Sequence, residues 1–361
     1  MLDFVKHRRF KTLLFQATTT VAIAVLVSIP QSSHTAVTSL RSLAENRLIL
    51  IGAAVAIKPL RNEPIYREIL AREFNSLTPE DAMKFRFTQP ERDRYDFIDA
   101  DTIVDFAENN NMKVRGHTLV WHRAVPKWLS EGKFTREELR EILRQHIYKV
   151  VGHYRKKLIA WDVVNEAIND NNTLRDTIWL RGIGSEYIDL AFRWAHEADP
   201  EARLFYNDYN GEGLGKKSDA IYDLVRGMLE RGVPIHGVGL QMHVAVNNSP
   251  PPAEVAANIE RLTALGLDVH ITEMDVQIQN ATGTETEKFA AQSKIYRDML
   301  KVCLSAPKCK AFVMWGFTDK HSWIPRFTGK PDAALIFDRF YRPKPAYNSL
   351  KEQLSNLGGR E

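Results

Sequence analysis

The sequence predicts a single (β/α)8 barrel, a TIM barrel with extended loops after its strands. Three observations favour this fold: eight short apolar runs follow one another from about residue 49 onward, longer amphipathic stretches separate them, and six of the runs finish on His, Asn, Gln, Glu or Asp. No Gly/Ser-rich linker, low-complexity tract or sequence repeat divides the chain. Eight strand–helix units therefore fit one barrel better than two doubly wound domains.

Each apolar run has the length and composition of a strand. The predicted strands are 49–55, 73–78, 113–121, 158–166, 203–210, 236–243, 267–275 and 310–317. Segments with helical spacing lie between them, among them 100–110, 135–154, 218–232, 252–266 and 287–303. Several of these segments begin at Thr, Ser or Asp and several end at Gly, as helices in proteins do.

Residues 1–36 are predicted to be a signal peptide or an N-terminal membrane anchor, and residues 45–356 the barrel domain. A basic start, "KHRRFK", precedes the mostly apolar run "VAIAVLVSIP" and the small polar stretch "QSSHTA". This order is typical of a secretory signal, and the apolar part is short for a membrane span. We therefore expect an exported protein, extracellular or periplasmic, with an uncleaved anchor as the alternative.

The charge of the chain excludes several kinds of partner. Of the formal net charge of +4, the segment before residue 37 supplies +3, from Lys6, Arg8, Arg9 and Lys11 against Asp3. The remaining body is close to neutral, so neither a nucleic-acid footprint nor a membrane-surface patch is indicated. We expect no nucleic-acid partner and no obligate protein partner.

The chain has two cysteines, Cys303 and Cys309, separated by a turn that contains proline. In an exported protein, a local disulfide that closes this turn is favoured over two free thiols. In a reducing compartment the opposite holds.

Polar residues at the strand ends indicate where chemistry takes place, because barrel enzymes carry their sites at the C-terminal ends of the strands. Glu166 ends the fourth predicted strand and Glu273 lies at the end of the seventh, roughly opposite it across the mouth. Two carboxyl groups that face each other across a cleft are what cleavage of a glycosidic bond requires. Strand alternation would send Asn165 and Glu166 to opposite faces, so we expect a bulge or an early strand end to re-aim one of them.

Histidines at the strand ends and loops raise a second possibility, a metal-dependent hydrolase. His117, His122, His243 and His321 each belong to a different strand or loop, and no His-x-His or His-Glu-x-x-His spacing occurs. We therefore expect no metal site, and hydrogen bonds from these residues to a substrate or to a glutamate instead. His270, inside an apolar strand, is expected to be a core residue.

Aromatic residues gather near the same strand ends, and barrel packing accounts for some of them. Aromatic faces beside carboxylates, amides and a lysine are also the material of a sugar-binding groove, and the combination favours carbohydrate. The residues concerned are Trp121, Trp128, Tyr206, Tyr209, Trp315 and Trp323.

These motifs resemble glycoside hydrolase family 10, the retaining endo-1,4-β-xylanases. The resemblance runs from about residue 74 to Tyr347, with "VRGHTLVWH", "WDVVNE", "NDYN", "GVGLQMH", "HITEMDV" and "WGFTDKHSW" in the order of the family. It implies an endo-acting hydrolase that cleaves internal β-1,4-xylosidic bonds of xylan by a two-glutamate double displacement, without a cofactor. The two carboxyl groups should then lie about 5 to 5.5 Å apart.

The resemblance also implies individual roles. Glu166 is the acid/base and Glu273 the nucleophile, Asn165 bonds the 2-hydroxyl of the sugar under attack, and His243, oriented by Asp275, bonds Glu273. Donors such as His243 and Asn165 are expected to keep the nucleophile ionised. The implied substrate-binding residues are Lys84, His117, Gln241 and Trp315 at the same sugar with Trp121 nearby, Glu80 and Trp323 at the next sugar toward the non-reducing end, Tyr209 on the leaving-group side, and Asp81 beside Glu80.

Three positions depart from the family pattern. Asp81 stands where the family usually has asparagine, Ala124 where it has glutamine, and Phe85 where tryptophan is common. The first two fall in the region that distinguishes xylose from glucose units. Two alternatives therefore stay open: a related two-glutamate barrel that acts on β-glucans or short oligosaccharides, and a carbohydrate-binding protein without turnover.

Overall fold

The computed structural model of the protein describes residues 38–356. The predicted signal or anchor segment, 1–36, lies outside the described residues. Within the described range, no helix is long and apolar enough to cross a membrane.

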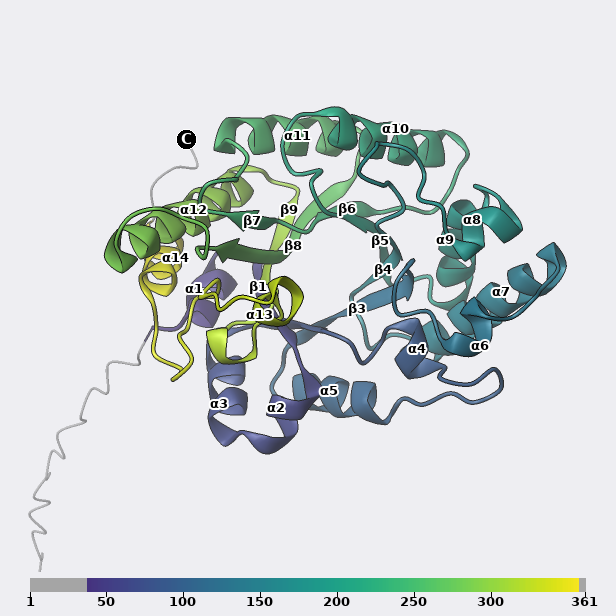
Figure 1. Cartoon of the computed structure of the whole chain (residues 1–361), viewed down its shortest axis with the longest axis horizontal. Helices are drawn as coiled ribbons and strands as arrows, with labels where there is room; N and C mark the ends of the chain where they lie inside the picture. Colours follow the sequence, from purple (N-terminus) through teal and green to yellow (C-terminus); the bar gives the residue numbers. More distant parts are fainter. Residues whose placement is uncertain (1–37, 357–361) are drawn as a thin grey trace, which may run out of the picture. The chain divides into compact units, whose positions relative to one another are not determined.

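Eight parallel strands close into a barrel (Figure 1). Around the ring the order is β1, β2, β3, β4, β5, β6, β8 and β9; β6 pairs with β8, and β9 pairs with β1 to close it. The short strand β7 pairs with the C-terminal half of β8. The bounds are β1 Leu50–Val55, β2 Ser76–Pro79, β3 Lys113–Val120, β4 Ala160–Asn165, β5 Arg203–Asp208, β6 Gly237–Leu240, β7 His243–Ala245, β8 Asp268–Gln277 and β9 Cys309–Met314.

Helices surround this barrel (Figure 1). Two long ones begin at the predicted kind of cap: Thr135 and Thr284 each accept a hydrogen bond from the main-chain N–H three residues later, and the glutamate at that later position accepts one from the main-chain N–H of the threonine. The bounds are α1 Leu40–Asn46, α2 Ile57–Asn62, α3 Pro64–Glu73, α4 Phe85–Thr88, α5 Ile98–Asn109, α6 Lys127–Ser130, α7 Arg136–His153, α8 Ile178–Ile183, α9 Tyr187–Ala198, α10 Lys216–Glu230, α11 Pro252–Ala264, α12 Glu285–Ser305, α13 Ile324–Thr328 and α14 Pro345–Ser355.

All eight predicted strands are present, which confirms the fold class. The predicted strand 236–243 differs from the structure, because β6 ends at Leu240 and the chain resumes as β7 at His243. Met242 between them has φ +65°, a left-handed conformation that turns the chain out of the ring and sets His243 beside Asp275 on β8. The break therefore serves the placement of a predicted functional histidine.

The cysteines form the predicted disulfide, Cys303 to Cys309. The bond joins the last turns of α12 to the first residue of β9, and both residues are buried. Since the polar strand ends lie at the other end of β9, the disulfide supports the barrel without contacting the candidate site.

Candidate active site

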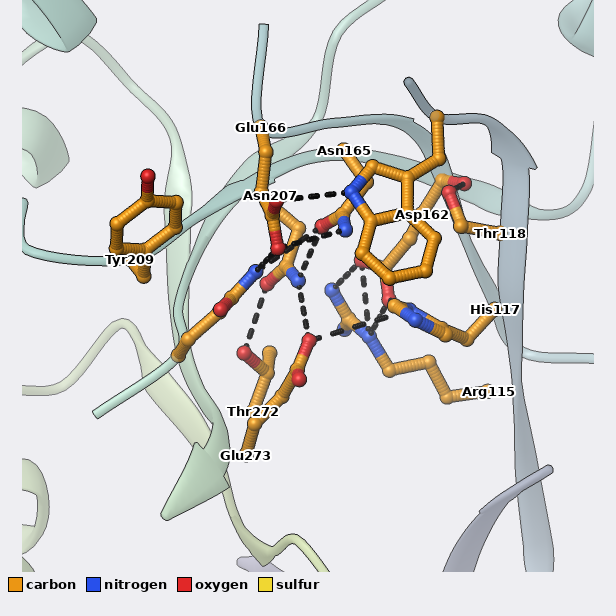
Figure 2. A network of polar contacts seen from close by, with 12 residues as sticks. Arg115, His117, Thr118, Asp162, Asn165, Glu166, Asn207, Tyr209, Thr272 and Glu273 are labelled. Carbon is orange, nitrogen blue, oxygen red and sulfur yellow. Dashed lines mark hydrogen bonds and ion pairs between the residues drawn. The ribbon is translucent and has the colours of Figure 1, made fainter. Parts of the chain in front are cut away.

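The two predicted glutamates point toward one another and belong to one network of polar contacts (Figure 2). Asn207 Nδ2 donates to Glu273 Oε1 over 2.7 Å, and its side-chain amide lies 2.8 Å from that of Asn165. Gln241 Nε2 donates to Glu166 Oε1 over 3.1 Å and lies 3.2 Å from the Asn165 amide. Three amides therefore connect the carboxyl groups at the mouth of the barrel.

Glu166 is re-aimed by its main chain, as strand alternation required. Strand β4 ends at Asn165, and Glu166 adopts φ +56°, which a residue with a side chain rarely takes. Its N–H donates to the main-chain oxygen of Asn207 over 2.9 Å, and its own carbonyl accepts from Arg175 Nε over 3.0 Å. These two bonds hold the left-handed residue so that Asn165 and Glu166 both reach the network.

The donors around the Glu166 carboxyl group are uncharged. Trp121 Nε1 donates to Oε2 over 2.8 Å, opposite the bond from Gln241. His122 Nδ1 lies 3.7 Å from the same oxygen. Burial, aided by the charges of Arg175 and two other basic side chains, lowers the pKa of His122 to about 4, so this imidazole is neutral.

Glu273 is buried between an amide and a histidine. His243 Nε2 lies 3.2 Å from Glu273 Oε2, and the opposite ring nitrogen lies 2.8 Å from Asp275 Oδ2. Trp323 Nε1 donates to the same Asp275 oxygen over 2.8 Å. The predicted chain from Asp275 through His243 to Glu273 is thus formed.

Charge in this chain favours an ionised Glu273. Burial by itself would raise the pKa of Glu273, but the hydrogen bond from His243 and the charges of His117 and His243 outweigh it, so the pKa lies below its ordinary value. Burial would lower the pKa of His243, yet Asp275 and Glu273 raise it well above its ordinary range. An imidazolium therefore faces a carboxylate at the candidate nucleophile.

Sequence reasoning missed Asn207 as a donor to Glu273 and named Asn165 as such a donor, whereas the predicted bond of Asn165 to the 2-hydroxyl of the sugar stays a prediction. The amide that donates to Glu273 belongs to Asn207, on β5, whereas Asn165 contacts Glu166 and the other amides. Thr272 Oγ1 donates to Asn207 Oδ1 over 2.7 Å, which orients the amide with its nitrogen toward Glu273. The signal was present, because Asn207 is a polar residue inside the apolar run that precedes Tyr209.

A buried ion pair beneath Glu273 was also missed. Arg115 Nε lies 3.0 Å from the Asp162 carboxylate, and His117 Nδ1 lies 3.0 Å from Asp162 Oδ2 and 4.0 Å from Glu273 Oε1. Burial would raise the pKa of Asp162, but Arg115 and His117 outweigh it, so the group stays ionised. Charged residues within otherwise apolar strands are the signal that identifies such a pair.

The predicted residues for the sugar under attack lie together above this network. Lys84 Nζ lies 4.9 Å from the ring centroid of Trp121 and 5.8 Å from that of Trp315. The ring of His117 meets Trp315 edge to face at 5.0 Å. Lys84, His117, Trp121 and Trp315 thus form one wall beside the two glutamates.

Asp81 introduces a charge into this wall. Its Oδ1 pairs with Lys84 Nζ at 2.8 Å, and its side chain is more than half exposed. Burial and the charge of Asp81 raise the pKa of Glu80 to about 7, against the opposing charges of Lys84 and Arg326. Glu80 is therefore protonated more readily than an ordinary glutamate.

Tyr209 lies on the Glu166 side of the network (Figure 2), and its contact with the leaving-group sugars stays a prediction. Its hydroxyl accepts from Arg175 Nη2 over 3.0 Å and donates to Asp170 Oδ1 over 2.8 Å. Lys217 Nζ lies 3.3 Å from its ring centroid. The residue that holds the Glu166 carbonyl, Arg175, therefore also positions Tyr209.

The other two departures differ in their consequence. Phe85 is buried, with its ring stacked on His146 at 3.5 Å and near Trp179 at 5.9 Å, so it packs in the core. Ala124 follows Trp121 in the loop after β3, adopts φ +53°, and accepts from Arg86 N over 2.9 Å. Of these two positions, only Ala124 lies in the loop that begins with Trp121, a donor to Glu166.

The four histidines considered for a metal have separate partners. His321 pairs with Glu63, whereas His117, His122 and His243 each lie beside a different carboxylate oxygen of the network. Over residues 38–356, no group of three or more His, Cys, Asp or Glu side chains is arranged to hold a metal ion. His270 is buried in the core with Nδ1 2.8 Å from Arg115 Nη1, as predicted.

Known proteins are similar to this chain in both sequence and fold. The sequence model of Glycosyl hydrolase family 10 matches residues 39–353. The curated protein "Endo-1,4-beta-xylanase B" of Thermotoga neapolitana is 44% identical over 317 residues, which cover 87% of this chain and 90% of that protein. The structure of xylanase 10B from Thermotoga petrophila RKU-1 in complex with xylobiose is 46% identical, with a TM-score of 0.85 over 88% of this chain and 97% of that one. Native xylanase 10B from Thermotoga maritima is 45% identical at the same TM-score, over 88% of this chain and 98% of that one.

Proposed function

The chain belongs to Glycosyl hydrolase family 10, and from this premise we propose that Glu273 and Glu166 are the nucleophile and the acid/base of a retaining xylanase. The activity is endo-hydrolysis of β-1,4-xylosidic bonds, as in the curated relatives. An oligosaccharide is the substrate, as the related structure with xylobiose supports.

One observation carries the assignment of roles: of the two carboxyl groups in the network, one has a charged hydrogen-bond donor and the other has only neutral donors. Glu273 is buried against His243, which carries a charge, and against Asn207, and both stabilise a carboxylate. Glu166 receives hydrogen bonds from Trp121 and Gln241, which carry no charge, so it lacks the cationic partner that Glu273 has in His243. A nucleophile must be ionised at the start of the reaction and a general acid must hold a proton.

In the first step, the ionised Glu273 attacks the anomeric carbon of the sugar that lies against Lys84, His117 and Trp315. Glu166 gives its proton to the glycosidic oxygen as the bond to the leaving chain breaks, and an ester forms between the sugar and Glu273. Tyr209, on the Glu166 side, supports the departing sugars.

In the second step, the Glu166 carboxylate takes a proton from water, and the oxygen of that water attacks the anomeric carbon. The ester bond to Glu273 breaks, so the sugar leaves with its original anomeric configuration and Glu166 regains its proton. The charged His243 stabilises Glu273 as its carboxylate returns. Two displacements at one carbon, each with inversion, produce the retained product.

The test compares Glu273→Ala and Glu166→Ala on xylan and on an aryl β-xylobioside with a good leaving group. Glu273→Ala should abolish turnover of both substrates, and azide should restore activity with an inverted glycosyl azide. Glu166→Ala should lose xylan cleavage but still form the glycosyl-enzyme from the aryl substrate, because a good leaving group departs without a proton. If Glu166→Ala cleaved xylan at a rate near that of the wild type, or if the wild-type product were inverted, the assignment would fail.

Two finer points belong to the same proposal. We propose xylan as the natural polymer, and comparing sugar release from xylan, carboxymethylcellulose and short aryl glycosides tests whether Asp81 and Ala124 alter the preference for xylose.

We also propose that the protein acts outside the cytoplasm, since the Cys303–Cys309 bond fits an oxidising compartment. Fractionation of the producing cell should then place activity in the medium, the periplasm or the membrane, and activity confined to the cytoplasm would contradict it.

A further inference from the structure

An exposed phenylalanine extends the aromatic surface beyond the predicted second sugar. Phe327 lies on the short helix α13 with 61% of its surface exposed. Its ring centroid is 4.9 Å from that of Trp323, and the two ring planes are tilted by 46°. A large apolar side chain that stays open to solvent next to a binding groove is a candidate contact for a ligand.

Trp323 fixes this aromatic pair to the catalytic network. Its Nε1 donates to Asp275, and its ring meets that of His243 at 5.1 Å. Trp323 is therefore anchored to Asp275 and His243, the two residues that support the candidate nucleophile. Phe327 lies one helical turn farther along α13, and a turn advances by about 5.4 Å. The pair therefore forms a continuous apolar strip that leads away from Glu273.

The strip runs on the side of the groove where the non-reducing end is expected. Arg326, beside Phe327 in the sequence, lies close enough to Glu80 for its charge to act on that carboxyl group. Glu80 and Trp323 are the residues assigned to the second sugar. Tyr209, the residue predicted for the leaving-group side, lies on the Glu166 side of the network (Figure 2). A sugar on Phe327 would therefore be the third counted from the cleaved bond.

Polar groups accompany the strip. Thr328, the last residue of α13, has its hydroxyl 3.4 Å from Gln279 Oε1, and Gln279 Nε2 donates to Gln277 Oε1 over 3.1 Å. The two glutamines come from the end of β8 and the loop after it. An aromatic face next to amide and hydroxyl groups is the combination that a sugar ring needs, because its C–H face is apolar and its rim carries hydroxyls.

We propose that Phe327 forms a third glycone site, on which a β-1,4-linked xylose unit stacks two sugars away from the one attacked by Glu273. The inference rests on the proposed function and adds a binding position to it. This third site makes the enzyme favour chains with at least three xylose units on the non-reducing side of the cleaved bond.

The experiment measures release of the aryl group from an aryl β-xylobioside and from the matching β-xylotrioside, which differ only by the sugar that would reach Phe327. Wild-type enzyme should have a higher kcat/KM for the trioside. Phe327→Ala should lower kcat/KM for the trioside by about 2- to 10-fold and leave the bioside unchanged, which also shows that the variant is folded. Phe327→Trp should keep the preference, because it keeps an aromatic face.

Phe340→Ala is the matched control, since Phe340 is 68% exposed and its ring is flanked by Arg339 and Arg342 instead of a groove aromatic. Phe340→Ala should leave kcat/KM unchanged for both the bioside and the trioside. Equal loss on both substrates in Phe327→Ala, no loss on either, or equal wild-type values for the two substrates would each overturn the third site. Failure of the wild-type enzyme to cleave both aryl substrates and xylan would instead overturn the proposed function.

Discussion

Asn207→Ala tests whether the buried amide keeps the nucleophile ionised. Asn207 is fully buried, and its Nδ2 lies 2.7 Å from Glu273 Oε1. A hydrogen bond to a charged group contributes about 1.5 to 3 kcal/mol, and one unit of pKa corresponds to about 1.36 kcal/mol. Removing the donor should therefore raise the pKa of Glu273 by about 1 to 2 units, with His243 still in place.

The direction follows from which form reacts. In the proposed mechanism only the carboxylate of Glu273 attacks, so the acidic limb of the pH profile of kcat/KM should report its ionisation in the free enzyme. Raising this pKa moves the acidic limb to higher pH by the same amount. The profile should be measured with an aryl β-xylobioside, whose leaving group makes the first step less dependent on Glu166.

Thr272→Val is the graded control. It removes the hydroxyl that orients Asn207 over 2.7 Å but keeps the amide itself, so the acidic limb should move in the same direction by a smaller amount. An acidic limb that does not move in Asn207→Ala, in a variant whose unfolding transition remains cooperative, would refute the assignment of Asn207 as the donor that stabilises the nucleophile.

Two further predictions concern the acid/base and the disulfide. Arg175→Met removes the hydrogen bonds to the Glu166 carbonyl and to Tyr209. Its kcat/KM on xylan should fall by at least about tenfold more than its kcat/KM on an aryl β-xylobioside with a good leaving group, because a misplaced acid matters most for a poor leaving group. Equal losses on both substrates would contradict this prediction. Replacing both Cys303 and Cys309 by alanine opens a loop whose ends are six residues apart. The free energy of unfolding, measured by urea titration, should fall by about 2 kcal/mol, and kcat at 25 °C should not change. An unchanged urea unfolding transition would show that the bond does not constrain the unfolded chain.

Local pattern was enough to predict the fold and to select two glutamates that the structure brings into one polar network. Apolar runs of strand length must be buried on both faces, and the amphipathic segments between them, with caps such as Thr135 and Thr284, must be buried on one face. A closed parallel barrel surrounded by helices meets both requirements. Glu166 and Glu273 could be identified because each interrupts the end of an apolar strand, where a carboxyl group has no structural purpose of its own.

Contacts between strands could not be predicted in the same way. Asn207, Asp162 and Arg115 are polar residues within apolar strands, and their partners lie on neighbouring strands or across the barrel. Which amide donates to Glu273 depends on strand register and on the Thr272 hydroxyl, so the donor is Asn207, and Asn165 belongs to the network as a neighbour of that amide.

The sequence by itself determined the fold class and the end of the barrel at which the two candidate glutamates lie, because hydrophobic periodicity and strand order are properties of the chain. Only the tertiary structure decided how Glu166 is aimed, since its left-handed main chain is held by Asn207 and Arg175. It also decided that Phe85 is a core residue and that Phe327 continues the Trp323 surface. Orientation and side-chain partners depend on residues distant in sequence, and these are brought together only when the barrel closes.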